Sequence, residues 1–476
     1  MAQFSIRKLL VANRGEIAVR IVRACNELGI RSVAIYSESD KNALHVKKAD
    51  EAYLLRGDPL SVYLDPHKLA NLALATGCDA VHPGYGFMSE NHLFSERCAR
   101  RGVHFVGPKP ETIRKMGDKV EARKAMMEAG VPVVPGSDGN LADAAAAVEC
   151  AEKIGYPVML KATSGGGGRG IRRCENPEEL RRNFERVVSE ASKAFGSAEV
   201  FMEKCVVNPR HIEVQIIADS HGNVCHLFER DCSIQRRNQK LIEIAPSPQL
   251  TASEREQVCA HAVAAARAVG YQNAGTVEFL LDERRNFYFM EMNTRLQVEH
   301  PVTETITGID LVQEQISVAA GEKLSFRQEE VGMRGVAIEF RINAEDPKKD
   351  FLPSFGKITR FYSPGGPGVR FDSGIYTGYM IPPYYDSLCG KLTVWALNWQ
   401  AALKRGRRGL SDMSIAGVKT TVPYYRMILS HEKIIAANFD TSFVEKHPEL
   451  TEYDDNPSRE DLAIAIAGAV VAAAGL

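Results

Sequence analysis

The chain contains 476 residues, enough for two to four domains with sizeable hydrophobic cores. Apolar residues make up 45% and charged residues 25%, as in average globular proteins, and the formal net charge is -1. This balance excludes the basic surface typical of proteins that bind nucleic acids or anionic membranes, so we expect a small-molecule or protein partner.

Cysteine usage and the apolar segments near the two ends bear on the cellular compartment. The ten cysteines form no C-x-x-C pair, and segment 1–13 has only a short apolar run, unlike a signal peptide. We therefore expect a cytoplasmic protein. The Ala-rich segment 462–476 is too short to span a bilayer, so we expect a helix or a docking tail there.

The first predicted domain, residues 1–114, begins with a βα unit of a parallel sheet. Segment 9–12 predicts a buried strand, 15–28 a helix ended by Gly29, and 32–36 a second strand. The turn Asn13-Arg14-Gly15-Glu16 lacks the G-x-G-x-x-G pattern that lets a pyrophosphate approach a helix N-terminus. A dinucleotide site is therefore disfavoured.

The rest of the chain mixes helical and strand-rich segments and predicts an α/β and α+β fold. Residues 115–331 form the second domain, in which 132–205 is a smaller lid-like subdomain with a helix at 142–154 and a strand at 157–161. Strands are expected at 211–217 and 224–228, and helices at 253–269 and from about 309 to Gly321. Residues 332–447 predict a strand-rich third domain, and 448–476 an Ala-rich tail.

Glycines and basic residues mark candidate phosphate contacts. Lys161 ends a predicted strand before the glycine run 164–170, whose N–H groups can surround phosphate oxygens, although no Walker A Lys-Ser or Lys-Thr follows. A flexible surface loop is the alternative. Lys119 and the basic cluster 236–240 can also bind phosphate or carboxylate oxygens, but a solvated charged surface explains the cluster equally well.

Two β-rich segments, 276–282 and 287–293, flank a polar turn and predict an antiparallel hairpin. Pairing Asp282 with Phe287 sets a register in which Glu278 lies directly opposite Glu291. Like charges at such positions, with Cβ atoms about 5 Å apart, are destabilising. A divalent cation removes the conflict, because Mg²⁺ binds carboxylates together with phosphates, and Asn293 adds an amide oxygen on the same side. Two ordinary surface acids are the alternative.

Polar residues continue at every second position after Glu291, through Asn293, Arg295 and Gln297 to Glu299. In an extended chain Glu291 and Glu299 would lie roughly 26 Å apart, too far to act on one phosphate. We therefore predict that the strand ends at Asn293 and that 295–299 turns back as a loop. A straight strand from 291 to 299 would contradict this prediction.

In combination these motifs resemble the biotin carboxylase component of biotin-dependent carboxylases, which belong to the ATP-grasp superfamily. The resemblance spans residues 7–447. It is carried by segments 12–18, 82–87, 229–233 and 291–301, and by Lys161 with the glycine run. The resemblance implies an ATP-grasp fold with an N-terminal parallel-sheet domain, a mobile glycine-rich lid and a strand-rich C-terminal domain.

The resemblance also implies the roles of individual residues. ATP would be held by Lys119, Lys161, Gly166, Gly167, Gly168, Glu203, Lys204, His211 and Gln235. Mg²⁺ or Mn²⁺ would be bound by Glu278, Glu291 and Asn293. Bicarbonate would be held by Lys240, Arg295, Gln297 and Val298.

The implied reaction joins ATP, bicarbonate and biotin to give ADP, phosphate and N-carboxybiotin through carboxyphosphate. Glu299 would be the base that deprotonates bicarbonate, and Arg341 would stabilise the oxyanion on the biotin ureido oxygen. A structural strand arginine is the alternative for Arg341. The sequence contains no Ala-Met-Lys-Met biotin attachment motif. Biotin is therefore expected on a separate carrier protein, with a carboxyltransferase as further partner and a homodimer as the assembly.

The sequence admits alternatives for one residue, for the carboxyl acceptor and for the reaction. Asn238 stands where many relatives have histidine, and an amide cannot carry charge. The acceptor of the carboxyl group could be acetyl-CoA, propionyl-CoA, pyruvate or 2-oxoglutarate, and the sequence looks most like the stand-alone component of a two-subunit pyruvate carboxylase. An ATP-grasp ligase that passes an acyl phosphate to an amine, and a non-catalytic nucleotide-binding partner, are the competing hypotheses.

Overall fold

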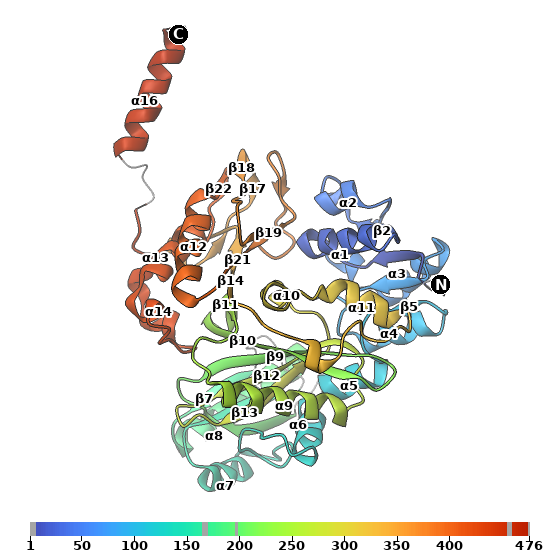
Figure 1. Ribbon diagram of the computed structural model, residues 1–476. Coiled ribbons are helices and arrows are strands. Elements are labelled where there is room, and N and C mark those ends of the chain that lie inside the picture. Colours follow the sequence, from blue (N-terminus) through green and yellow to red (C-terminus); the bar gives the residue numbers. More distant parts are fainter. Residues whose placement is uncertain (1–5, 164–169, 196–198, 455–458, 475–476) are drawn as a thin grey trace.

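The computed structural model of the chain describes residues 6–163, 170–195, 199–454 and 459–474 (Figure 1). Its N-terminal part is a five-stranded parallel sheet of order β3-β2-β1-β4-β5. The strands are β1 (Lys8–Val11), β2 (Arg31–Tyr36), β3 (Glu51–Leu54), β4 (Ala80–His82) and β5 (His104–Phe105). The helices are α1 (Gly15–Glu27), α2 (Leu44–Lys48), α3 (Pro66–Ala75), α4 (His92–Ala99) and α5 (Pro110–Gly117).

The βα unit predicted at the start of the chain is confirmed. Helix α1 buries an apolar stripe that includes Ile17 and Ile21, and strands β1 and β2 pair in parallel on either side of it in sequence. Gly29 follows the helix with φ 71°, a left-handed conformation that glycine adopts without steric cost. The turn between β1 and α1 is the one that lacks the G-x-G-x-x-G pattern.

The segment after α6 (Lys119–Glu128) forms a small subdomain around a three-stranded antiparallel sheet of order β7-β6-β8. Its elements are α7 (Ala144–Ile154), β6 (Val158–Ala162), β7 (Ile171–Cys174), α8 (Pro177–Phe195) and β8 (Val200–Lys204). Both helices pack on this sheet through one apolar cluster. Gly166, Gly167 and Gly168 lie outside the described residues.

A single eight-stranded antiparallel sheet of order β13-β12-β9-β10-β11-β14-β21-β19 forms the centre of the molecule. Its strands are β9 (Arg210–Ala218), β10 (Val224–Arg236), β11 (Gln239–Ala245), β12 (Asn273–Leu281), β13 (Phe287–Asn293), β14 (Val336–Asn343), β19 (Val369–Ser373) and β21 (Leu388–Ala396). The predicted second domain (115–331) and third domain (332–447) therefore share this sheet, because β11 hydrogen-bonds to β14.

Strand β10 is much longer than the predicted strand 224–228. The register shifts between His226 and Glu229, where Phe228 has φ 65°, and the strand then continues through charged residues. Such a bulge adds a residue and re-aims the chain. The charged residues after the bulge are not typical of a buried strand, so the sequence did not predict this part of β10. In the structure these charges are buried in ion pairs rather than solvated.

The helices that follow the small subdomain come from the second half of the chain. They are α9 (Ala252–Ala268), α10 (His300–Thr307), α11 (Leu311–Ala319), α12 (Trp399–Asp412), α13 (Val422–Ser430), α14 (Glu432–Ile435), α15 (Phe443–Lys446) and α16 (Arg459–Ala473). Short strands are β15 (Glu345–Asp346), β16 (Leu352–Pro353), β17 (Gly356–Lys357), β18 (Arg360–Tyr362), β20 (Met380–Ile381) and β22 (Ser414–Ala416). Short 3-10 helices are Glu38–Asp40, Ser61–Tyr63, Gln328–Glu330, Pro347–Lys349 and Pro448–Thr451.

The Ala-rich tail forms a helix, one of the two structures expected for it. Helix α16 projects away from the rest of the structure (Figure 1), and Ile466, Val470 and Val471 are exposed on it. Among the described residues, no helix combines the length and the hydropathy needed to cross a membrane.

The β12–β13 hairpin has the predicted carboxylate pair but a different turn. Glu278 pairs with Glu291, whereas Phe287 pairs with Leu281 rather than with Asp282. A register shift between Glu278 and Phe279 absorbs the difference of one residue. The predicted pairing at the turn was therefore wrong by one residue. The predicted pair of Glu278 and Glu291 is nevertheless correct, because the register shift lies between that pair and the turn.

Candidate active site

The chain turns sharply after β13, and this turn builds the site. Strand β13 ends at Asn293 and α10 begins at His300, so segment 294–299 is a loop. The loop folds back over the sheet, since Gln297 Nε2 donates a hydrogen bond to Glu278 Oε1 at 2.8 Å. The prediction of a strand that ends at Asn293 is confirmed, and the straight strand is excluded.

The two paired carboxylates have different environments. Lys240 Nζ donates to Glu278 Oε1 at 3.0 Å, Asn293 Nδ2 donates to the same oxygen at 2.8 Å, and His211 Nε2 lies 2.9 Å from Glu278 Oε2. Burial alone would raise the pKa of Glu278, but Lys240 and His211 hold it well below its ordinary value. Glu278 is therefore a stable carboxylate anion at neutral pH.

Glu291 has no hydrogen-bond or ion-pair partner among the residues that the structure describes. Burial first, and then the charge of Glu278, raise its pKa, while the charge of Lys119 opposes them. A half-buried carboxylate opposite a second carboxylate leaves uncompensated negative charge. The oxygen donors of Glu278, Glu291 and Asn293 therefore fit a hard divalent cation.

Glu299 lies between two cations at the end of the returning loop. Lys240 Nζ contacts its Oε1 at 2.7 Å, and Arg341 Nη2 contacts its Oε2 at 3.0 Å. The side chain is buried. Burial raises its pKa, but Lys240, Arg341 and Arg230 together hold the pKa well below the ordinary value. Glu299 is therefore ionised and immobilised in this structure.

A row of charges across the sheet supports these groups. Glu213 on β9 lies opposite Glu278 on β12 and opposite Arg230 on β10, and it accepts from both Arg230 and Lys240. Arg230 is fully buried and also donates to Gln297 Oε1 at 2.9 Å. Through Gln297, this row of charges holds the returning loop against the sheet.

The sequence analysis missed Glu213 and Arg230, although a signal was present. His211, Glu213 and Gln215 alternate with three aliphatic residues, and all three polar side chains are buried. Polar residues on one face of an otherwise apolar strand indicate a buried polar network rather than a solvated face. The same pattern recurs on β14, at Glu339 and Arg341.

The remaining loop residues contact two other parts of the chain. Arg295 Nε donates to Glu90 Oε2 at 2.9 Å, and its Nη2 donates to Asn293 Oδ1 at 2.9 Å. The carbonyl of Val298 accepts from Lys391 Nζ at 2.7 Å. Lys391 is fully buried and pairs with Glu16 of α1 at 3.2 Å. The loop therefore touches the N-terminal part and the C-terminal strands at once.

A second group of predicted residues lies towards the small subdomain. Lys161 on β6 forms an ion pair with Glu203 on β8. Lys119 is within electrostatic range of Glu291, Lys161 and Glu203; burial, the largest effect, lowers its pKa. The Lys204 ammonium instead donates to the carbonyls of Gly155 and Tyr156, both at 2.8 Å.

The predicted basic cluster 236–240 divides into two parts. Arg236 and Arg237 pair with Asp350, whereas Lys240 enters the carboxylate cluster. Arg237 and Asn238 form the two-residue turn between β10 and β11, with φ 48° and 64°. Such a turn needs two residues with positive φ, and asparagine adopts this conformation more readily than most residues. Asn238 is therefore well suited to the hairpin tip.

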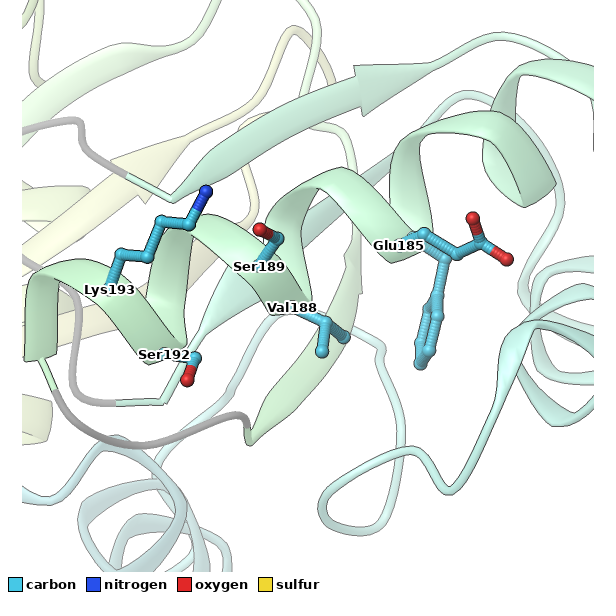
Figure 2. A pocket seen from close by; sticks show the side chains of 6 residues that line it. Glu185, Val188, Ser189, Ser192 and Lys193 are labelled. Atoms are coloured by element: carbon cyan, nitrogen blue, oxygen red, sulfur yellow. The ribbon is translucent and has the colours of Figure 1, made fainter.

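A surface hollow and a histidine cluster lie outside this site. A hollow of about 400 Å³ along α8 is lined from that helix alone (Figure 2). Its lining residues are Phe184, Glu185, Val188, Ser189, Ser192 and Lys193. Because no charged groups converge on it from other elements in the described residues, it resembles a shallow surface rather than an active site.

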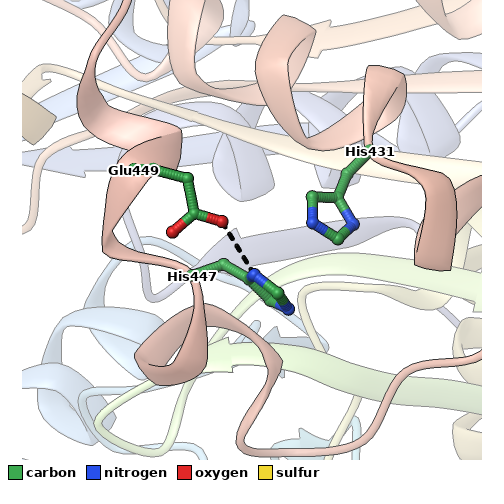
Figure 3. Close-up of side chains that lie close together, drawn as sticks. All are labelled: His431, His447 and Glu449. Atoms are coloured by element: carbon green, nitrogen blue, oxygen red, sulfur yellow. Dashed lines mark hydrogen bonds and ion pairs between the residues drawn. The ribbon is translucent and has the colours of Figure 1, made fainter.

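His431, His447 and Glu449 gather on the C-terminal helices (Figure 3). His447 Nδ1 lies 2.8 Å from Glu449 Oε1, and Lys433 Nζ lies 3.3 Å from His447 Nε2. His431 Nδ1 accepts from the backbone N–H of Lys433 as a helix cap. An ammonium group already lies at this cluster, so it does not need a metal for charge balance.

Paired carboxylates fit a metal, lysines fit phosphates, and this combination of groups is typical of ATP-dependent ligases. Three family descriptions match the chain in order. They are biotin carboxylase, N-terminal domain, at residues 5–113, carbamoyl-phosphate synthase L chain, ATP binding domain, at 118–327, and biotin carboxylase C-terminal domain at 339–446.

Relatives that match nearly the whole chain agree with these descriptions. The 2-oxoglutarate carboxylase small subunit of Hydrogenobacter thermophilus is 52% identical over 470 residues, which cover 99% of this chain and 100% of that protein. A solved biotin carboxylase subunit of pyruvate carboxylase is 54% identical, with a TM-score of 0.83, and 94% of this chain and 100% of that chain are covered.

A second solved structure has the same fold over nearly the whole chain. It is the biotin carboxylase domain dimer of the Hydrogenobacter thermophilus 2-oxoglutarate carboxylase in complex with MgADP, ADP and bicarbonate. The TM-score is 0.93 and the identity 53%, with 95% of this chain and 100% of that chain covered. The chain belongs to the biotin carboxylase family, and it is an ATP-dependent ligase that carboxylates biotin with bicarbonate.

Proposed function

We propose that this chain is the biotin carboxylase subunit of a multisubunit carboxylase and that Glu299, held between Lys240 and Arg341, is the centre of its chemistry. The single observation that carries the assignment of Glu299 is its contact with Lys240 and Arg341, of which Lys240 also contacts Glu278. Biotin would arrive on a separate carrier protein and leave to a carboxyltransferase. Two relatives of matching length support this arrangement, because their names describe a small subunit of one carboxylase and the biotin carboxylase subunit of another. The dimer named for the other solved relative supports a homodimer.

Glu299 is the proposed base that removes the proton of bicarbonate. In the structure its proton affinity is low because Lys240 and Arg341 neutralise it. A bound bicarbonate anion would compete for Lys240 and Arg295 and would add negative charge beside Glu299. Both effects raise the proton affinity of Glu299. The base would therefore become effective when its substrate is bound, with the proton ending on a Glu299 oxygen.

Arg295, Gln297, Val298 and Lys240 are the proposed bicarbonate contacts. Arg295 can hold a carboxylate-like anion through two parallel N–H groups. Lys391 supports this arrangement, because its contact with the Val298 carbonyl fixes the main chain beside Glu299. The deprotonated bicarbonate oxygen attacks the γ-phosphorus of ATP, the bond to ADP breaks, and carboxyphosphate results.

The ATP side is assigned from the second group of residues. Glu278, Glu291 and Asn293 would hold Mg²⁺ or Mn²⁺, which when bound offsets the negative charge of the phosphates. Lys119 and Lys161 would contact the phosphates, and His211 and Gln235 the phosphates or ribose. Glu203 and Lys204 would lie near the adenine, and the Lys204 ammonium donates to the carbonyls of Gly155 and Tyr156.

Arg341 is the proposed contact for biotin. Carboxyphosphate breaks into CO₂ and a phosphate trianion, and the trianion takes the proton from the biotin N1′. Negative charge then develops on the ureido oxygen as N1′ attacks CO₂, and a guanidinium at that oxygen stabilises it. Arg341 Nη1 has no hydrogen-bond partner among the described residues, so it is the donor available for this contact.

Release of ADP in the presence of ATP, Mg²⁺, bicarbonate and free biotin tests the proposed function. The proposal expects turnover that depends on both biotin and bicarbonate. Equal turnover without biotin would favour a ligase that uses an amine acceptor, and ATP binding without turnover would favour a non-catalytic partner protein. Copurification of a biotinylated protein and a carboxyltransferase with this chain tests the partners.

A further inference from the structure

Two buried carboxyl groups behind Arg341 have no role in the chemistry above. Glu243 on β11 and Glu339 on β14 occupy directly opposite positions in the antiparallel pair. Both side chains are fully buried. Directly opposite residues have Cβ atoms about 5 Å apart and point to the same face of a sheet. Two carboxylates this close in a dry interior cannot both be ionised at low cost.

The hydrogen bonds of the pair account for only two of its four oxygens. Glu243 Oε1 accepts from Arg341 Nε at 2.6 Å, and Glu339 Oε2 accepts from Thr393 Oγ1 at 3.2 Å. Glu243 Oε2 and Glu339 Oε1 are buried and have no partner among the described residues. A proton on one of the two groups would supply a donor for an oxygen of the other, which satisfies both unpaired atoms.

The surroundings favour a neutral group at this position. Below the pair, α10 packs an apolar cluster of Ala245, Val302, Ile306 and Ala337 against the same face of the sheet. The charged groups that interact with the pair are Lys240, Glu299, Arg341 and Lys391, and two further titratable groups, Cys232 and Tyr425, lie close to Glu243. Arg341 and Lys240 already pair with Glu299, and Lys391 pairs with Glu16. The neighbouring cations are therefore shared with other anions.

We propose that Glu243 and Glu339 share a single proton at neutral pH, with the charge on Glu243, and that this pair positions Arg341. One guanidinium then lies between two single negative charges, Glu243 at Nε and Glu299 at Nη2. A second charge on Glu339 would draw Arg341 towards the sheet and away from Glu299. Burial, the main cause, raises the pKa of both carboxyl groups, in agreement with a retained proton.

The pair acts on the reaction through Arg341, so this inference rests on the role proposed for that residue. Loss of the shared proton at alkaline pH would pull the arginine from its position and lower turnover with biotin. The substitution Glu339→Gln imitates the protonated group and removes this ionisation. The substitution Glu243→Gln removes the charged partner of Arg341 instead.

Infrared difference spectroscopy of the full-length protein at neutral pH tests the proton. We expect a protonated-carboxyl band in the wild type that disappears in Glu339→Gln and persists in the control Glu256→Gln, which replaces a solvent-exposed carboxylate on α9. A wild type without such a band, or one whose band is unchanged in Glu339→Gln, would overturn the shared proton. This readout does not depend on the role of Arg341 or on turnover.

Kinetics of the same variants test the positioning. Glu243→Gln should lower kcat/KM for biotin at least about tenfold more than Glu339→Gln does, and Glu339→Gln should move the alkaline limb of the kcat profile to higher pH. Equal losses in both variants with an unmoved limb would overturn the positioning role. Biotin-dependent turnover of the wild type in the same preparation separates this failure from failure of the proposed function.

Discussion

Replacing Glu299 with glutamine tests the proposed base most severely. The amide keeps the shape of the side chain and can still accept from Lys240 or Arg341, but it cannot take a proton from bicarbonate. General-base catalysis contributes about 10²–10⁴-fold to a rate. We therefore expect kcat to fall by at least about 10², which is about 2.7 kcal/mol in activation free energy.

The assay is steady-state ADP release at saturating biotin, with bicarbonate and ATP varied separately. ATP affinity should be largely intact, because Glu299 contacts Lys240 and Arg341 rather than Lys119 or Lys161. A variant with wild-type kcat would refute the assignment of Glu299 as the base. Loss of ATP binding in place of kcat would move Glu299 into the metal site.

Three further substitutions probe other parts of the structure. Glu291→Gln removes the carboxylate opposite Glu278 and should raise the Mg²⁺ concentration for half-maximal activity about tenfold or more, in a Mg²⁺ titration. An unchanged requirement would exclude Glu291 as a ligand. Lys391→Met leaves Glu16 and the Val298 carbonyl without their cation, so the free energy of unfolding should fall by about 3–5 kcal/mol. This should appear as a lower Tm, together with a higher KM for bicarbonate. An unchanged Tm and KM would contradict the role of these contacts. The hydrogen bond from Arg285 is the main cause that lowers the pKa of Glu254 to about 2, so its stabilisation is present above about pH 4.5 and is lost as the pH falls towards 2. Glu254→Gln should therefore lower stability at pH 7 by no more than about 1 kcal/mol, since the pair is partly solvated, and the difference from wild type in urea unfolding should vanish near pH 2.

The strongest sequence predictions rested on local periodicity. The first βα unit, the hairpin with Glu278 opposite Glu291, and the turn after Asn293 all follow from strand and helix patterns within about 30 residues. The hairpin also shows the limit of such reasoning. A bulge inside the strands cannot be read from alternation, so the turn pairing was wrong by one residue although the carboxylate pair was right.

Long-range contacts were not predictable in the same way. Lys391 reaches Val298 and Glu16, and these three residues lie far apart in the sequence with no pattern that links them. Glu213 and Glu339 were within reach, because each alternates with apolar residues on a strand. Buried charge on an apolar strand is rare without a partner, so such alternation is a usable signal for an active site.

Transfer of oxygen from bicarbonate tests the central claim most directly. If bicarbonate attacks the γ-phosphorus and carboxyphosphate then breaks to CO₂, one bicarbonate oxygen must end on phosphate. Turnover of ¹⁸O-labelled bicarbonate with ATP and biotin should therefore give inorganic phosphate that carries one label, measured by mass spectrometry. Unlabelled phosphate formed at the same rate as ADP would mean that water attacks ATP, and it would contradict the account.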